Sequence, residues 1–433
     1  MDARTFVTEY LMLGLRFDRI AAGFVDCYTG DAELRRRVHD EPRPDPARLA
    51  AMAGRLRADL AETDLAETDP IEAGTGPCAS ELPQQRRRFL DSQLAALECS
   101  GRILAGERLP FRSEVEAYFQ VTIARGDQDA YRRAHVELAE VLPGGGALRE
   151  RIAAVRESER VPIGKLEPCV RALSGALRAR VRQRFGLPEQ EDVEYRLVTG
   201  RPWSGLHSYL GNYRSRVAVN ADSPQRMANL AHLVAHEAYP GHHTQHCRRG
   251  SRSPAGTSAD AAPSSRPRRD EQDLSLVNTP QCLMSEGLAD LGLHAAIGAG
   301  WGPWAAEIFA DLGLRLEGER AERMTEILDR LRPVRQDAAL MLHEEHADET
   351  EVIAYLQRWL LVPEERARRL VGFLAHPLWR AYTTTYVEGY RLLRSWLRAR
   401  PQEVTPEERY RRLLDEPLVP RSLRAELAGR TRI

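Results

Sequence analysis

The 433-residue chain has little of what disulfide-rich secreted proteins and membrane proteins require. Its six cysteines are widely spaced and form no CxxC pair, which is typical of reduced thiols rather than of a disulfide framework. No stretch approaches the roughly 18 consecutive apolar residues of a membrane span. Residues 1–20 also lack the basic and apolar segments of a secretory signal. We therefore expect a cytoplasmic protein that does not bind a membrane.

An excess of charge of either sign is also missing. The formal net charge is −1, while 29% of the residues are charged and 42% are hydrophobic. This is the composition of an ordinary globular protein, without the excess of basic side chains that nucleic-acid binding needs. The sequence therefore predicts no nucleic-acid partner.

Helical periodicity dominates what is present. Leu13, Phe17, Ile20 and Phe24 recur at the spacing of one helix face, and similar patterns fill most of the chain. We expect a mainly α fold with two regions. Residues 1–190 form an N-terminal helical region without a catalytic constellation, and residues 191–433 form the catalytic region.

Two short segments interrupt the helical pattern. Residues 193–198 and 215–220 alternate like strands, which predicts a small β-hairpin or an edge strand beside the catalytic residues. A helix is then expected from Ser223, as its N-cap, through the motif described next. Residues 249–273 are rich in Ser, Pro, Arg and Ala and predict a disordered insertion.

The chemistry centres on the run HEAYPGHH at residues 236–243. In the helical zinc motif HExxH, two histidines one turn apart bind the metal and the glutamate acts as general base. Here the histidine after His236 and Glu237 is His242, at i+6, which a straight helix would turn away by roughly 240°. Pro240 and Gly241 favour a bulge or break just past His236, which would bring His242 back toward the ion.

Two other histidines compete as ligands. His243, at i+7, returns to the face of His236 but lies about 10.5 Å along a straight helix, so it is the alternative ligand or a neighbour of the ligands. His232, four residues before His236, shares its face and is a second alternative. We favour His236 and His242.

The motif resembles the signature of the bacterial domain-of-unknown-function 885 family, which is grouped with the zincin-like metallopeptidases. Three further segments are similar to that family: residues 24–30 (FVDCYTG), 285–287 (SEG) and 386–389 (YVEG). The resemblance covers nearly the whole chain. It implies a zincin-like, gluzincin-type helical architecture and a hydrolase activity, and it implies no particular substrate.

In gluzincin-type sites a second helix supplies the third ligand. Glu286 and Asp290 fit the ExxxD pattern, so Glu286 is expected to bind the metal and Asp290 to orient a ligand histidine. Glu237 would be the catalytic base, and Tyr386 would donate to the developing oxyanion, with Tyr382 as the alternative.

Substrate would be bound partly by a strand that precedes the metal helix. We expect Val217, Val219 and Asn220 to line an edge to which a peptide can add, with Tyr382 nearby. Either a plain hairpin or such an edge fits the pattern.

The leading hypothesis is a zinc peptidase that acts on a peptide or a small amide. The same groups would serve a zinc hydrolase of non-peptide amides or esters, such as a biosynthetic tailoring enzyme. A catalytically silent helical binding protein is the third hypothesis, and the presence of Glu237 argues against it.

Overall fold

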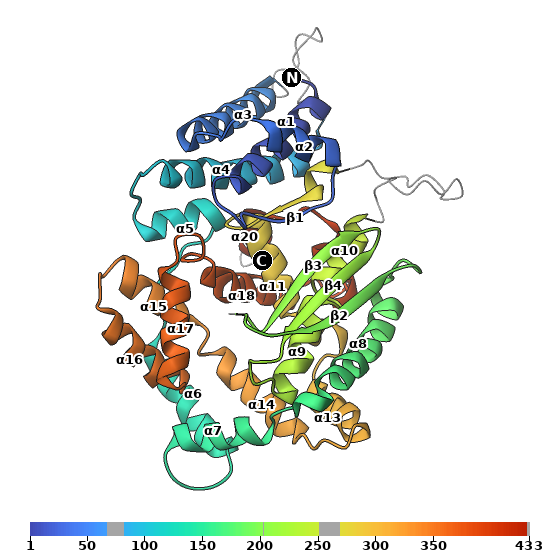
Figure 1. The fold of residues 1–433 in the computed structure, drawn as a ribbon, viewed down its shortest axis with the longest axis vertical. Helices are drawn as coiled ribbons and strands as arrows, with labels where there is room; N and C mark the ends of the chain where they lie inside the picture. Colours follow the sequence, from blue (N-terminus) through green and yellow to red (C-terminus); the bar gives the residue numbers. More distant parts are fainter. Residues whose placement is uncertain (67–81, 202, 251–268, 431–433) are drawn as a thin grey trace. The chain divides into compact units, whose positions relative to one another are not determined.

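A computed structural model of the chain describes residues 1–66, 82–201, 203–250 and 269–430. These residues are mainly helical, which confirms the predicted mainly α class (Figure 1). No helix in these ranges is both long enough and apolar enough to cross a membrane. Most of the predicted insertion, residues 251–268, lies outside the described residues; its ends belong to a helix and a short 3-10 turn.

The chain forms two compact units, and each unit is built from more than one segment of the chain. Unit 1 comprises residues 1–123, 252–284 and 416–433, and unit 2 comprises residues 124–251 and 285–415. This differs from the predicted division near residue 190. The physical reason is that residues 163–185 form a helix that packs against a strand and the motif helix of unit 2, so they belong with the catalytic region.

Unit 1 is built from helices with one small sheet. Its third and fourth helices pack along each other, and the first packs against the third. The two short strands pair antiparallel, with Val25 opposite Leu276. The elements are α1 (Ala3–Asp18), β1 (Val25–Tyr28), α2 (Ala32–Asp40), α3 (Pro46–Ala66), α4 (Gln84–Leu104), α5 (Phe111–Phe119), η2 (Asp270–Asp273), β5 (Leu274–Leu276) and α20 (Pro420–Arg430).

Unit 2 combines a three-stranded sheet with most of the remaining helices (Figure 1). Its elements before residue 251 are α6 (Gln128–Val141), α7 (Leu148–Ser158), α8 (Ile163–Phe185), β2 (Asp192–Val198), β3 (Gly205–Gly211), β4 (Arg214–Asn220), α9 (Met227–Glu237) and α10 (His242–Gly250). Those after residue 284 are the end of α11 (Pro280–Asp290), α12 (Gly292–Ala296), α13 (Trp301–Asp311), α14 (Gly318–Asp329), α15 (Pro333–His343), α16 (Glu349–Leu360), α17 (Glu364–Ala375), η3 (Thr385–Gly389), α18 (Tyr390–Arg398) and α19 (Pro406–Asp415).

The strand order in unit 2 is β2-β4-β3. The predicted strands at 193–198 and 215–220 are confirmed as β2 and β4, which pair parallel, with Tyr195 opposite Val217. An unpredicted strand, β3, pairs antiparallel with the other side of β4. Of the two predicted alternatives, the β-hairpin is confirmed, because the consecutive strands β3 and β4 pair antiparallel, whereas the edge strand is wrong for β4, because both of its sides are hydrogen-bonded. The edges are β2 and β3.

Helices pack against the sheet, and two of them, α9 and α10, contain the motif. α8 contacts β2, α9 contacts β3, and α10 contacts both β3 and β4. α9 begins at Met227, four residues later than the predicted cap at Ser223. The delay follows from two backbone hydrogen bonds, from Val161 N to Gln225 O and from Met227 N to Glu159 O, which hold the preceding residues extended.

Candidate metal centre

The motif helix breaks where the sequence predicts. α9 ends at Glu237 and α10 begins at His242, so the helical path is interrupted just past His236. Gly241 is required here, because a β-carbon at this position would collide with the carbonyl oxygen of His236 and lie 2.6 Å from that of Ala235. The predicted break is confirmed, and its backbone leaves no room for a side chain.

The break brings three predicted ligands together. His236 Nε2 and His242 Nε2 are 3.2 Å apart, and Glu286 lies 3.4 Å from the first ring and 3.5 Å from the second. All three ligand atoms fall within 4.8 Å of one another. Two nitrogens bound to one zinc at about 2.1 Å are roughly 3.4 Å apart. The spacing therefore matches that of ligands around one ion.

Two of the three side chains have the protonation states that a metal site uses. The exception is His236: although burial acts in the opposite direction, the carboxylates of Asp290 and Glu286 raise its pKa well above the ordinary value, so a metal ion would have to replace the proton on its Nε2. Burial lowers the pKa of His242 to about 4, which keeps its ring neutral at pH 7. Burial alone would raise the pKa of Glu286, but the two histidines lower it, so the carboxylate is ionised. One carboxylate oxygen of Glu286 is buried and has no hydrogen-bond partner among the described residues. The chemistry of this donor set, two imidazoles and a carboxylate, fits zinc.

Asp290 holds His236 in position, as predicted from its place one turn after Glu286. Its Oδ1 lies 3.0 Å from His236 Nδ1, so the proton sits on Nδ1 and Nε2 faces the other two ligands. Arg332, which the sequence analysis missed, donates to the other oxygen of Asp290 at 2.5 Å and also to Asp329. Although burial acts in the opposite direction, Arg332 and His236 hold the pKa of Asp290 well below its ordinary value.

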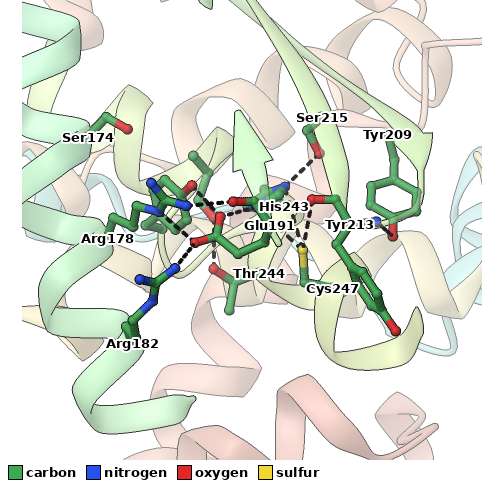
Figure 2. A network of polar contacts seen from close by, with 12 residues as sticks. Ser174, Arg178, Arg182, Glu191, Tyr209, Tyr213, Ser215, His243, Thr244 and Cys247 are labelled. Atoms are coloured by element: carbon green, nitrogen blue, oxygen red, sulfur yellow. Dashed lines mark hydrogen bonds and ion pairs between the residues drawn. The ribbon is translucent and has the colours of Figure 1, made fainter. Parts of the chain in front are cut away.

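His243 points away from this cluster and into a second network, shown in Figure 2. Its Nε2 lies 3.0 Å from a carboxylate oxygen of Glu191, and its Nδ1 lies 2.7 Å from the hydroxyl of Ser215. Because both ring nitrogens are engaged, His243 is not free to bind the metal. It anchors the start of α10 to the sheet instead.

Glu191 is the centre of that network, and the sequence analysis missed it. Its carboxylate is fully buried and accepts hydrogen bonds from Tyr239, Arg178 and Arg182 as well as His243 (Figure 2). Burial would raise the pKa of Glu191, but the hydrogen bonds from His243, Tyr239 and Arg178 lower it. Tyr239 and His243 both belong to the motif, so their hydrogen bonds to Glu191 hold the motif in place.

His232 does not join the cluster. Its ring packs edge-on against Trp301, with the centroids 4.7 Å apart, and its buried Nε2 has no partner among the described residues. Burial lowers the pKa of His232 to about 4. The alternative in which His232 and His236 bind the metal is therefore not the arrangement observed.

Glu237, the predicted base, ends α9 and lies against the edge strand β3. Its side chain is almost buried, at 8% exposure, and a β-carbon at Gly205 would come within 3.2 Å of its Oε1. Gly205 thus leaves the space in which the Glu237 carboxylate lies, a role that the sequence alone does not reveal.

The two predicted tyrosines differ in their contacts. The Tyr382 hydroxyl donates to Glu286 at 2.9 Å, whereas the Tyr386 ring packs edge-on against the Tyr382 ring with centroids 5.6 Å apart. The segments that carry Glu286 and Tyr386 are in close backbone contact, since a β-carbon at Gly287 would lie 2.6 Å from the carbonyl carbon of Gly389. The segments SEG and YVEG therefore pack glycine against glycine.

The three predicted substrate-binding residues of β4 do not form an accessible edge. Val217 and Val219 are buried in the core, and the Asn220 side chain donates to the backbone oxygens of Arg201 and Trp203. Because β4 is the central strand, its backbone is already paired on both sides. The accessible edge nearest Glu237 is β3, where His207 lies with its ring 5.8 Å from that of His242.

No protein-family model and no curated protein matches this chain. Two solved structures are similar to it. One is "the putative lipoprotein from Colwellia psychrerythraea", at 15% identity and a TM-score of 0.49, over 81% of this chain and 64% of that one, less than two thirds of its length. The other is "a putative lipoprotein of unknown function from Shewanella oneidensis", at 13% identity and a TM-score of 0.48, over 98% of this chain and 82% of that one.

Proposed function

We propose that this protein is a zinc-dependent hydrolase that cleaves a peptide or small amide bond. The observation that carries the proposal is the convergence of His236, His242 and Glu286, whose ligand atoms lie within 4.8 Å of one another. The resemblance of HEAYPGHH to the domain-of-unknown-function 885 family, with its zincin-like grouping, is consistent with it.

The residues around the three ligands supply the remaining groups of such a hydrolase. When bound, zinc would polarise the scissile carbonyl and lower the pKa of a bound water to about 7. Glu237 would take the proton from that water and pass it to the leaving amine. Asp290 keeps the Nε2 of His236 free for the ion by holding the ring through Nδ1.

Tyr382 is the better candidate for the oxyanion donor than Tyr386. Its hydroxyl already reaches the carboxylate of a proposed ligand, Glu286, and can turn from there toward a substrate oxygen. A substrate in extended form could add to the edge of β3, which runs beside Glu237. The proposed substrate-binding strand is therefore β3 rather than β4.

The decisive experiment measures bound zinc and hydrolysis in the same preparations. We expect about one zinc per wild-type chain, and loss of zinc in His242→Ala, while His39→Ala, an exposed histidine of α2, serves as the matched control. Glu237→Gln should keep its zinc but lose roughly 10²–10⁴-fold in hydrolysis of a peptide and amide library, since it removes the general base.

The outcomes separate the competing functions. A wild-type chain that binds no zinc, or a Glu237→Gln variant that hydrolyses as fast as wild type, would contradict the proposal. Bound zinc without turnover of any peptide, amide or ester would favour the silent binding protein. Turnover of esters or non-peptide amides alone would favour the tailoring enzyme.

A further inference from the structure

Four aromatic side chains of unit 2 form a continuous row beside the candidate metal centre. Tyr382 lies in the middle, with its ring centroid 5.4 Å from that of Trp379 and 6.3 Å from that of Phe373. On its other side, the ring centroid of Tyr386 is 5.6 Å away. Phe373 and Trp379 also face each other, with nearly parallel planes and centroids 6.4 Å apart. We call these four residues the aromatic row. The proposed mechanism uses the Tyr382 hydroxyl but none of the rings.

The aromatic row is joined directly to a proposed metal ligand. The Tyr382 hydroxyl donates to Oε1 of Glu286 at 2.9 Å, so the other three rings surround a side chain that touches the ligand set. The ligands are accessible to solvent, because the side chain of His236 is 17% exposed and that of His242 is 15% exposed. A substrate that reaches these ligands therefore lies next to the row.

The other end of the row lies at the surface. Phe373 is 36% exposed, and Trp379 and Tyr382 are half-buried. The buried face of α17 is formed by three other side chains, Ala367, Val371 and Leu374. Phe373 is therefore not part of the face that packs this helix. A single exposed apolar residue is ordinary, but adjoining aromatic rings that are partly exposed beside a candidate active site indicate a binding surface.

The backbone holds the central rings of the row in place. α17 ends at Ala375, and His376 is extended because it precedes a proline. Turn hydrogen bonds then join Trp379 N to His376 O and Tyr382 N to Trp379 O, both at 3.0 Å. Thr385 donates to the carbonyl oxygen of Tyr382 through both its backbone N–H and its hydroxyl. Rings that are positioned in advance lose little conformational freedom when a ligand binds.

We propose that the aromatic row binds an aromatic side chain of the substrate, next to the bond that the candidate metal centre cleaves. This inference rests on the proposed hydrolase function and narrows its substrate class to peptides or amides that carry such a ring. Tyr382 meets Trp379 at 80° and Phe373 at 89°, and an incoming ring can extend these edge-to-face contacts, which aromatic rings prefer. A cationic side chain is disfavoured, because it would lie near a divalent cation.

Substrate preference gives the first test. Acylated dipeptide amides are compared that differ in one side chain, phenylalanine, leucine, alanine or lysine, placed in turn on each side of the scissile bond. At one of these positions we expect kcat/KM for phenylalanine to exceed that for alanine by about tenfold or more, with leucine between them. Trp379→Ala should lower this phenylalanine-to-alanine ratio by about tenfold, with zinc content unchanged. The ratio is the readout because a general loss of activity does not change it.

Matched variants guard the interpretation. Trp379→Phe keeps a ring and should retain more of the preference than Trp379→Ala. Trp304→Ala removes another half-buried tryptophan, on α13 and outside the row, and should keep the wild-type ratio. Because Phe373 is at the surface, Phe373→Ala should fold even if Trp379→Ala does not, and it should also lower the ratio. A wild type that does not prefer phenylalanine, or alanine variants at both positions that keep its preference, would overturn the proposal.

A binding measurement separates the aromatic row from the hydrolase function. N-acetylphenylalanine methylamide and N-acetylalanine methylamide are titrated into the full chain carrying Glu237→Gln, so that the probes are not consumed, and saturation transfer from protein to probe is measured by NMR. We expect transfer to the phenyl ring of the first probe and little to the second. Adding Phe373→Ala and Trp379→Ala to the same chain should weaken binding of the first probe about tenfold or more.

The two measurements fail in different ways. Binding of the phenylalanine probe that the double alanine variant leaves unchanged, or equal binding of the two probes, would overturn the aromatic site. Binding at the row without hydrolysis of any peptide or amide would refute the hydrolase function alone. Hydrolysis that ignores the aromatic side chain would refute the role of the row and leave the hydrolase function standing.

Discussion

At the scale of single residues, Tyr382 and Tyr386 lie four positions apart and make different contacts. Tyr382 donates to Glu286, a proposed ligand, whereas Tyr386 packs its ring against that of Tyr382. The sequence analysis favoured Tyr386, because a tyrosine in a motif is easier to notice than one that precedes it. The close backbone contact between Gly287 and Gly389, which joins the segments that carry Glu286 and Tyr386, could not be read from the sequence.

The two tyrosines give a paired prediction. Tyr382→Phe should lower kcat by about 10²–10³-fold, the range seen when one oxyanion donor is removed, with zinc content unchanged. Tyr386→Phe should change kcat by less than about tenfold, as a variant that keeps its ring packing and removes no such donor. Steady-state kinetics on a cleaved amide measure both, and a larger loss in Tyr386→Phe would reverse the assignment.

Glu191 illustrates what residue patterns do not reveal. It lies in an acidic stretch before β2 that resembles any solvated turn, yet its side chain is fully buried beneath the motif. By contrast, the spacing of His236, Pro240, Gly241 and His242 was enough to predict the break. Local steric rules act within a few residues, whereas the burial of Glu191 depends on α8 and α10 packing on either side of it.

The charge on Glu191 should be visible in stability. Glu191→Gln leaves Arg178 and Arg182 without a carboxylate and should cost about 3–5 kcal/mol in the free energy of unfolding at pH 7. The lower end is expected because these arginines are 36% and 47% exposed. The pKa of Glu191 is lowered by folding, so its contribution is present above its unfolded pKa, about 4.3, and is lost as the pH falls through its native pKa.

Denaturant unfolding from pH 7 to pH 3 measures this effect. The gap between wild type and Glu191→Gln should be constant above about pH 5 and narrow below it, with the wild type falling more steeply. A gap that stays the same down to pH 3 would mean that folding does not lower the pKa of Glu191.

At the scale of elements, the break between α9 and α10 is the feature on which the ligand geometry depends. Gly241 permits it, because a β-carbon there would collide with the carbonyl of His236. We expect Gly241→Ala to lower zinc affinity by more than tenfold and to destabilise the protein by about 1–3 kcal/mol through overpacking.

Gly175 provides the control for this substitution. It lies inside α8 with nothing within 4 Å of an added β-carbon, so Gly175→Ala should stabilise the protein by about 0.5–1 kcal/mol and leave zinc binding unchanged. Zinc titration and thermal unfolding of the two variants give the comparison. A Gly241→Ala variant that binds zinc as wild type does would show that the break tolerates a side chain.

The sheet marks the limit of prediction for elements. Alternation identified β2 and β4, because half-buried strands repeat with a period of two. Alternation did not predict β3, because this strand contains glycine, histidine and serine without a clear alternation of apolar residues. Strand order depends on pairing between segments, so β4 was taken for an edge although it is central.

At the scale of the whole molecule, the two units draw on interleaved stretches of chain. Residues 252–284 return to unit 1 after the motif, and residues 416–433 do so again at the end. Composition gives no sign of this exchange, because helices of both units have the same amphipathic pattern. The helical class was therefore predictable, while the division near residue 190 was not.

The tryptophans allow the two units to be followed separately. All six belong to unit 2, at positions 203, 301, 304, 359, 379 and 396, so their fluorescence reports that unit, while circular dichroism reports helices of both. Zinc at about a thousand times its Kd should stabilise the native form by about 4 kcal/mol and raise the fluorescence midpoint by several degrees.

The circular dichroism signal should contain a component from unit 1 whose unfolding midpoint zinc raises less, because the proposed ligands all lie in unit 2. A chelator should reverse the fluorescence shift. Identical shifts in both signals would indicate that the chain unfolds as a single cooperative body, and no shift in either would argue against a zinc site.

The opposite directions of His242 and His243 have a consequence for how this chain can vary. The two adjacent imidazoles have different contacts. His242 lies beside Glu286 in the proposed metal site, whereas His243 holds α10 to Glu191 and Ser215. A turn normally tolerates gain or loss of a residue. Here, one residue removed between positions 237 and 242 would bring His243 to the ligand position and Thr244 to the position that contacts Glu191. One residue added would bring His242 to the position that contacts Glu191 and Gly241 to the ligand position. The length of this turn should be as invariant as the histidines themselves.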